Sequence, residues 1–352
     1  MTPLARLIAA QIRLSGPMGL DEYMQLCLLH PQHGYYATRD PFGVQGDFTT
    51  APEISQMFGE MIGLALAQAW QDQGSPTPFT LAEVGPGRGT LMADILRVLR
   101  GVPGMAQAAR LVLVEASAHL QRVQRDRLGA VQHVGRLDDL PMAPLFLVAN
   151  EFFDALPIKQ LHRSKDGWSE CVVTLDGDGA LAFGLGAALD GPAAPPGEIR
   201  EICPAARPAV DQIAGRIARF GGCAIFLDYG GWNGRGDTLQ ALRRHAFDDP
   251  LAHPGEADLT AHVDFAPLAQ AAVAAGAQVS RLETQGDWLL RLGIAQRAQR
   301  LTAAGDAKAA AALHRLTDAA EMGQLFKVLA LWSPGAPVPA GFERLELDAR
   351  DA

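Results

Sequence analysis

Three glycines alternate with other residues in the segment from Glu83 to Thr90, which reads Glu-Val-Gly-Pro-Gly-Arg-Gly-Thr. The segment follows an apolar run typical of a buried strand and precedes a helical pattern. Glycine lets the backbone turn sharply and lets a ligand approach it closely. The turn is therefore a candidate cofactor site, with the binding residues Glu83, Gly85, Pro86, Gly87, Gly89 and Thr90.

Four interpretations of this glycine pattern compete. A P-loop is excluded because no Gly-Lys-Ser/Thr follows. A dinucleotide fingerprint, Gly-x-Gly-x-x-Gly, fits less well because the third glycine arrives one residue early. A purely structural tight turn stays open. The turn acidic-x-Gly-x-Gly-x-Gly of methyltransferases that use S-adenosylmethionine (SAM) fits best, because the Glu83 carboxylate can hold the methionine ammonium group directly or through water.

A second carboxylate, Glu115, ends the next apolar run. In this position a carboxylate accepts hydrogen bonds from both ribose hydroxyls, in NAD enzymes and in methyltransferases alike. Glu115 thus indicates an adenosine-type ligand without choosing between them, and a solvated acid at a strand end is the alternative. Asp138 follows a further candidate strand at 131–134, where an acidic side chain can contact the adenine amine; an exposed loop acid explains it nearly as well.

The segment Asn-Glu-Phe-Phe-Asp-Ala-Leu-Pro at 150–157 directly follows a third apolar run. Open α/β sheets bind ligands at the carboxyl ends of their strands, so these side chains are candidates for the reacting centre. The catalytic candidates are Asn150, Glu151 and Asp154, and Asn150 is also a cofactor candidate. The first two could hold a guanidinium or an amine, and Phe153 could line the channel by cation–π contact. Alternatively, the phenylalanines are core residues and Asp154 caps a following helix.

Residues 31–52 are rich in Gly, Pro, Asp and aromatic residues, which predicts a long ordered loop. The loop contains more polar and aromatic residues than a segment that only connects two helices needs, so we expect it to cover the cofactor. Thr49 or Thr50 is expected to cap a helix that begins near Pro52. The candidate lid and substrate residues are Tyr35, Asp47, Phe48, Thr49, Glu53, Gln56 and Phe153.

Apolar runs that alternate with helical patterns predict an α/β fold with a parallel, doubly wound sheet. Helices are expected at 20–30, 53–71, 118–128 and 205–220, and an inserted β-hairpin between 158 and 183. The expected strands are 79–84, 110–115, 145–150 and 223–228, with later candidates at 277–282 and 325–330.

Composition excludes several function classes. The net charge of −9 argues against a nucleic-acid partner. Four scattered cysteines argue against a disulfide framework or a zinc site, so no metal is expected, and they fit a reducing compartment. No apolar run approaches the ~18–20 residues that span a bilayer, so no membrane insertion is expected. Residues 4–13 predict an amphipathic helix rather than a targeting peptide.

Taken together, these motifs make the chain similar to the MidA-like family of SAM-dependent methyltransferases. That family includes a mitochondrial complex I assembly factor that symmetrically dimethylates an arginine. The segments at 46–60 and 150–157 carry the resemblance most specifically, since many families share the glycine turn. The matching segments are 30–36, 46–60, 83–90, 150–157, 228–230, 258–265, 284–286 and 322–329.

The resemblance implies a Rossmann-like methyltransferase core, SAM as cofactor, and symmetric dimethylation of an arginine in a respiratory complex I subunit or its bacterial counterpart. The alternatives are methylation of a small molecule or another protein, and a SAM-binding assembly chaperone with little catalysis. The expected location is the cytoplasm for a bacterial chain and the mitochondrial matrix for a eukaryotic one; oligomerisation stays open. The expected parts are a helical cap with the active-site loop (1–77), the first half of the core (78–157), an inserted β-rich substrate region (158–215) and the second half of the core (216–352).

Overall fold

The four predicted apolar runs form the centre of one sheet in a computed structural model that describes residues 1–38 and 50–346. The chain divides into two units, each of which is described by itself. The first unit contains residues 1–48, 153–206 and 233–264, and the second contains residues 49–152, 207–232 and 265–352. The expected four-part division of the chain stays a prediction.

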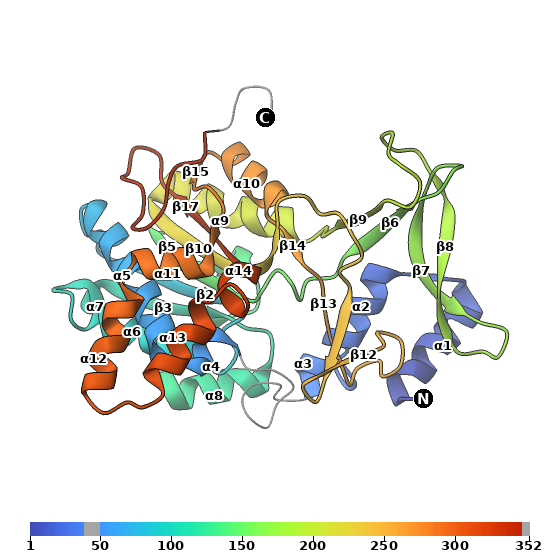
Figure 1. The fold of residues 1–352 in the computed structure, drawn as a ribbon, viewed down its shortest axis with the longest axis horizontal. Helices are drawn as coiled ribbons and strands as arrows, with labels where there is room; N and C mark the ends of the chain where they lie inside the picture. Colours follow the sequence, from blue (N-terminus) through green and yellow to red (C-terminus); the bar gives the residue numbers. More distant parts are fainter. Residues whose placement is uncertain (39–49, 347–352) are drawn as a thin grey trace. The chain divides into compact units, whose positions relative to one another are not determined.

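The sheet of the second unit has the strand order β15-β17-β10-β5-β2-β3-β4, and β16 also pairs with β17. Figure 1 labels β15, β17, β10, β5, β2 and β3 of this sheet. The pairs from β10 to β4 are parallel, and β17 is antiparallel to β10. The predicted doubly wound α/β core is therefore confirmed. Its strands are β2 (Phe79–Val84), β3 (Ala109–Val114), β4 (Gln132–Val134), β5 (Leu145–Asn150), β10 (Gly222–Gly231), β15 (Gln278–Val279), β16 (Glu283–Thr284) and β17 (Phe326–Trp332).

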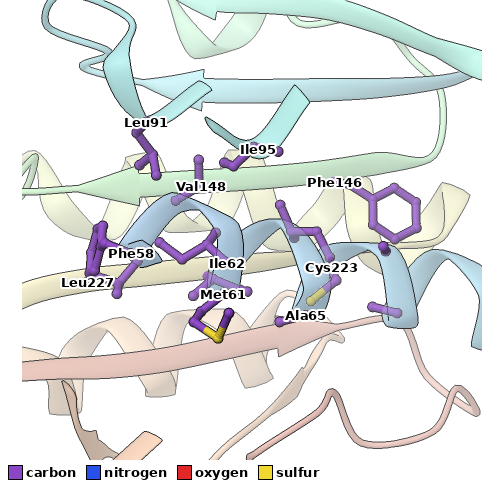
Figure 2. Close-up of a cluster of buried hydrophobic side chains, with 14 of the residues drawn as sticks. Phe58, Met61, Ile62, Ala65, Leu91, Ile95, Phe146, Val148, Cys223 and Leu227 are labelled. Carbon is purple, nitrogen blue, oxygen red and sulfur yellow. The ribbon is translucent and has the colours of Figure 1, made fainter. Parts of the chain in front are cut away.

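Helices of the second unit cover this sheet. Apolar side chains of α5 and α6 meet Phe146, Val148 and Cys223 of the sheet in one buried cluster (Figure 2). Helix α10 also contacts β10 and β17. The helices are α4 (Ala51–Ile54), α5 (Gln56–Asp72), α6 (Thr90–Leu99), α7 (Met105–Ala108), α8 (Ala118–Leu128), η1 (Leu137–Asp139), α9 (Ala206–Phe220), α10 (Phe265–Ala274), α11 (Gln285–Arg291), α12 (Ile294–Ala303), α13 (Ala309–Thr317) and α14 (Met322–Leu325).

Two sequence-based boundaries were wrong. The helix expected at 53–71 is divided at Ser55, whose backbone is extended and whose hydroxyl caps α5 by accepting from the Met57 N–H at 3.2 Å. Thr50 occupies the N-cap position of α4 as predicted, but its carbonyl rather than its hydroxyl accepts from the Glu53 N–H. The strand expected at 277–282 is reduced to β15.

The first unit combines helices with two small antiparallel sheets. One sheet has the order β1-β7-β6-β9, with β8 paired to β7, and the other has the order β12-β11-β13. The predicted inserted hairpin is part of the first sheet. No helix in the described part of the chain is long and apolar enough to cross a membrane. The elements are α1 (Pro3–Ser15), β1 (Met18–Gly19), α2 (Leu20–Leu29), α3 (Tyr35–Thr38), β6 (Lys159–Arg163), β7 (Trp168–Leu175), β8 (Leu181–Leu189), β9 (Ile199–Ile202), β11 (Gln240–Arg243), β12 (Ala246–Asp248), β13 (Asp258–Thr260) and β14 (Val263–Asp264).

Phe146 offers a test of the core in the second unit. Its ring is fully buried and meets Phe79 edge to face at 5.2 Å between centroids. We expect Phe146→Ala to lower the free energy of unfolding by about 3–5 kcal/mol, because it removes buried apolar area and leaves a cavity. Phe247→Ala is the matched control, since Phe247 is 78% exposed and should change stability by no more than about 0.5 kcal/mol. Urea denaturation measures both, and equal effects would contradict the assignment of the core.

Candidate functional site

The candidate residues of the second unit lie together because the central strands end at the same level. Val84 of β2 pairs with Val114 of β3 and with Ala149 of β5. Asn150 of β5 pairs in turn with Leu227 of β10. The residues that follow these strands therefore emerge side by side along the carboxyl edge of the sheet, which is where open α/β sheets bind ligands.

The glycines of the turn have a backbone conformation that other residues rarely adopt. Gly85, Gly87 and Gly89 have φ angles of +64°, +49° and +74°, and glycine takes this left-handed conformation without the steric cost of a Cβ. The Gly85 N–H donates to the Val114 carbonyl at 3.2 Å, which ties the turn to β3. A Cβ on Gly85 would lie 3.4 Å from the Phe152 ring, so the turn also packs closely on the segment that follows β5.

Glu83, at the end of β2, carries a buried carboxyl group. Its exposed fraction is 3%, and its Oε2 has no hydrogen-bond partner within the described residues. Burial raises the pKa of this carboxyl well above its ordinary value; the hydrogen bond from the Met92 backbone opposes that rise, and the nearby Glu115 adds to it. An isolated carboxyl is costly to bury, so an incoming ammonium group would be a fitting partner.

The Glu115 carboxylate is held in one orientation by two donors. Its Oε1 accepts from the Ser117 N–H at 2.7 Å, and its Oε2 accepts from Gln124 Nε2 at 3.2 Å. Burial raises the pKa of this group, and the hydrogen bonds from Ser117 and Gln124 oppose the rise. Each oxygen keeps further acceptor capacity, which matches two ribose hydroxyl donors.

The segment after β5 combines an amide, a carboxylate and a strained backbone. Asn150 is 9% exposed, its Nδ2 donates to Glu151 Oε1 at 3.0 Å, and its Oδ1 has no hydrogen-bond partner within the described residues. Glu151 has a φ of +51°, which is rare for a residue with a Cβ. Its N–H donates to the Leu227 carbonyl at 2.9 Å, which holds this conformation in place. Strain of this kind gathers at functional sites.

Asp228 of β10 is a buried carboxylate beside this segment. Its side chain is fully buried, and its Oδ2 accepts from the Phe152 N–H at 3.2 Å. Asp228 belongs to a motif that carried the family resemblance, but it was missed as a site residue because a single acid in a strand gives no signal of its neighbours. Gln124 was also missed, since it is one of several polar residues on α8.

Two of the lid candidates contact α6, one at its first residue and the other in its last turn. Glu53 Oε1 accepts from the Thr90 hydroxyl at 2.6 Å, and Gln56 Oε1 accepts from Arg97 Nη1 at 3.0 Å. Arg127 also donates to the Thr90 hydroxyl. These contacts tie α4 and α5 to the helix that begins at the glycine turn.

The remaining candidates fall into three groups. Tyr35, Phe153 and Asp154 are buried residues of the first unit. No helix follows Asp154, because turns lead from it to β6, so the alternative in which it caps a helix was wrong. Asp138 lies in η1 with a half-exposed side chain 3.1 Å from Arg136. The candidates Asp47, Phe48 and Thr49 lie outside the described residues.

Comparisons with known proteins identify the family. Residues 61–282 match the family described as "Putative S-adenosyl-L-methionine-dependent methyltransferase". The mitochondrial protein arginine methyltransferase NDUFAF7 homolog of Drosophila melanogaster is 36% identical to this chain, over 94% of this chain and 85% of that protein. The mitochondrial protein arginine methyltransferase NDUFAF7 of Homo sapiens is 34% identical, over 84% of this chain and 74% of that protein. A Burkholderia thailandensis structure with bound S-adenosyl-homocysteine matches with a TM-score of 0.84 and 31% identity, over 96% of this chain and 93% of that one. The chain belongs to this methyltransferase family.

The methyltransferase uses SAM as its cofactor, so the family resemblance, the fold class and the cofactor predicted from the sequence are confirmed. The residues of the carboxyl edge fit this molecule. We propose that Glu83 holds its ammonium group, that the glycine turn approaches its centre, and that Glu115 accepts from its ribose hydroxyls. The observation that carries this assignment is the Glu83 oxygen that has no hydrogen-bond partner among residues 1–38 and 50–346.

The raised pKa of Glu83 makes SAM binding depend on pH. Only the ionised carboxylate attracts an ammonium group, so protonation of Glu83 competes with the ligand. We expect SAM affinity to fall by up to about tenfold per pH unit as the pH drops below the raised pKa. Calorimetry across mildly basic to acidic pH measures this. Glu83→Gln should flatten the profile, and adenosine, which lacks the ammonium group, is the control ligand; a flat profile for the unchanged protein would contradict the role.

Glu115 has a separate test on the ribose side. We expect Glu115→Ala to weaken SAM binding by about 1–3 kcal/mol, because two ligand hydroxyls lose a charged acceptor. Asp126→Ala is the matched control, since Asp126 is an exposed acid of the neighbouring helix α8 and should leave affinity unchanged. Equal Kd values for Glu115→Ala and the unchanged protein would remove Glu115 from the cofactor site.

Proposed function

We propose that this methyltransferase transfers methyl groups to arginine side chains of a protein. Its relatives from fly and human, at 36% and 34% identity, are named protein arginine methyltransferases. The specific reaction we propose is symmetric dimethylation of a respiratory complex I subunit, or of its bacterial counterpart. The compartment follows from the source: the cytoplasm for a bacterial chain, and the mitochondrial matrix for a eukaryotic one.

Two carboxylates, one directly after β5 and one within β10, are the structural observation that supports an arginine acceptor. Glu151 and Asp228 come from neighbouring strands, and Asp228 is fully buried. Carboxylates bind a guanidinium with paired, charge-assisted hydrogen bonds. Within the second unit, these acids lie on the same sheet edge as the glycine turn, so an arginine held there would face the bound cofactor.

Methyl transfer requires an in-line approach of the acceptor nitrogen. SAM supplies a methyl group on a sulfonium sulfur; as the new N–C bond forms, the C–S bond breaks, its electrons stay on sulfur, and S-adenosyl-homocysteine is left. The acceptor nitrogen must also lose a proton. We propose that Glu151 accepts a hydrogen bond from this nitrogen, orients its lone pair and receives the proton, while Asn150 holds the Glu151 carboxylate at 3.0 Å.

Glu151→Gln tests the proposed role of this carboxylate. The variant keeps the shape and removes the charge, so we expect kcat for arginine methylation to fall at least about 100-fold. The Kd of S-adenosyl-homocysteine should stay within about twofold of its original value, because Glu151 is assigned to the acceptor side. Glu343→Gln is the matched control, since the Glu343 side chain is 63% exposed. Unchanged kcat in Glu151→Gln would remove Glu151 from the mechanism.

The acceptor itself is identified by labelled-methyl transfer. The purified chain and labelled SAM are added to a lysate of source cells that lack this protein, and the labelled product is analysed by mass spectrometry. Symmetric dimethylarginine in a complex I subunit or its counterpart is the expected product. Label found only in small metabolites would overturn the proposal in favour of a small-molecule methyltransferase.

The chaperone alternative is tested in the same cells. Gly87→Val places a branched side chain at a left-handed glycine and should abolish cofactor binding. Glu151→Ala should abolish transfer while cofactor binding is retained. If both variants lose methyl transfer and yet fully support assembly of the complex, assembly does not depend on methylation and the proposed function is incomplete.

A further inference from the structure

We propose that Gln124 is a positioning residue for the cofactor, which locks the Glu115 carboxylate to the glycine turn and is itself oriented by His133. The inference rests on SAM binding and not on the identity of the methyl acceptor. It concerns a residue of α8, outside the glycine turn and outside the strand ends.

Gln124 bridges two cofactor elements that come from different strands. Its side chain is fully buried. Its Nε2 donates to the Gly87 carbonyl at 2.7 Å and to Glu115 Oε2 at 3.2 Å. A carbonyl and a carboxylate oxygen can only accept, so both N–H groups of the amide must face them, and this fixes which way the amide is turned.

His133 completes the arrangement from β4. With the amide so turned, Gln124 Oε1 faces His133 Nε2 at 2.8 Å, so this nitrogen must carry a hydrogen. The other ring nitrogen, Nδ1, lies 3.4 Å from Arg125 Nη1, which can only donate. The neutral imidazole with its hydrogen on Nε2 satisfies both contacts. Burial, and then the charge of Arg125, lower the pKa of His133, which favours this neutral form.

The hydrogen bonds that run from His133 through Gln124 to Glu115 and Gly87, called the relay below, give α8 a direct part in shaping the site. The Ser117 N–H holds one oxygen of Glu115 and Gln124 holds the other, so the carboxylate is held in one orientation. The same amide holds the carbonyl of Gly87, at the middle of the turn. A Cβ on Gly89 would lie 3.6 Å from Gln124 Cγ, which shows how closely the helix packs on the turn. Without the amide, no side chain of α8 would link the glycine turn to the Glu115 carboxylate in this way.

Gln124→Met tests this role because methionine has a similar length and fills the same buried space without hydrogen bonds. We expect the Kd of S-adenosyl-homocysteine, measured by calorimetry on the full chain, to rise about 5- to 50-fold. Gln124→Glu should bind more weakly still, since it places a second carboxylate against Glu115. Gln121→Ala is the matched control, because Gln121 lies on the same helix and donates to the backbone carbonyl of Glu115, at 2.8 Å, rather than to its carboxylate.

A double-mutant cycle separates positioning from mere structural support. If Gln124 acts through Glu115, Gln124→Met should have a much smaller effect on Kd when Glu115→Ala is already present. Adenosine should lose as much affinity as S-adenosyl-homocysteine, because the relay serves the ribose side. His133→Phe should weaken binding in the same direction, and His133→Gln, which can again donate to Gln124, should restore part of it.

The outcomes are decisive in both directions. Unchanged Kd in Gln124→Met, or effects of Gln124→Met and Glu115→Ala that simply add, would overturn the proposal. Thermal unfolding of each variant shows whether it is folded; if Gln124→Met does not fold, the His133 pair carries the test alone. If Gln124→Met loses arginine methylation but keeps its cofactor affinity, the relay is refuted while the proposed function stands.

Discussion

Parallel, in-register hydrogen bonding between β2, β3, β5 and β10 is the constraint on which the site depends. Val84 lies opposite Val114 and Ala149, and Asn150 lies opposite Leu227. Each strand therefore ends at the same level, and the residues that follow it reach one edge of the sheet. A shift of the register by one residue would turn each side chain to the other face of the sheet, and it would separate the glycine turn from its carboxylates.

The cost of burying charge explains the chemistry of that edge. Burial raises the pKa of both Glu83 and Glu115. Two hydrogen-bond donors offset the cost of burying the Glu115 carboxylate, whereas one Glu83 oxygen has no hydrogen-bond partner within the described residues. A ligand that brings one cation and two hydroxyl donors satisfies both groups. The fold thus holds the acids ready at the expense of its own stability, as binding sites commonly do.

Local patterns predicted the strands well because burial on both faces leaves an unmistakable apolar run. They predicted the helix ends less well. The division of the helix at Ser55 depends on a capping hydrogen bond from Met57 and on packing, neither of which is visible in apolar spacing. The strand at 277–282 was overestimated because its length is set by pairing with β17, and only Gln278 and Val279 pair.

The sequence by itself determined the glycine turn, the acid before it, the carboxylate after the next strand and the family resemblance, because these features are local and periodic. Only the tertiary structure decided which side chains touch. Gln124 contacts Gly87 and Asp228 contacts Phe152, over separations of 37 and 76 residues. It also assigned Tyr35 and Asp154 to a different unit from Glu151. The physical reason is that hydrogen bonds and packing act through space, whereas propensity and periodicity act along the chain.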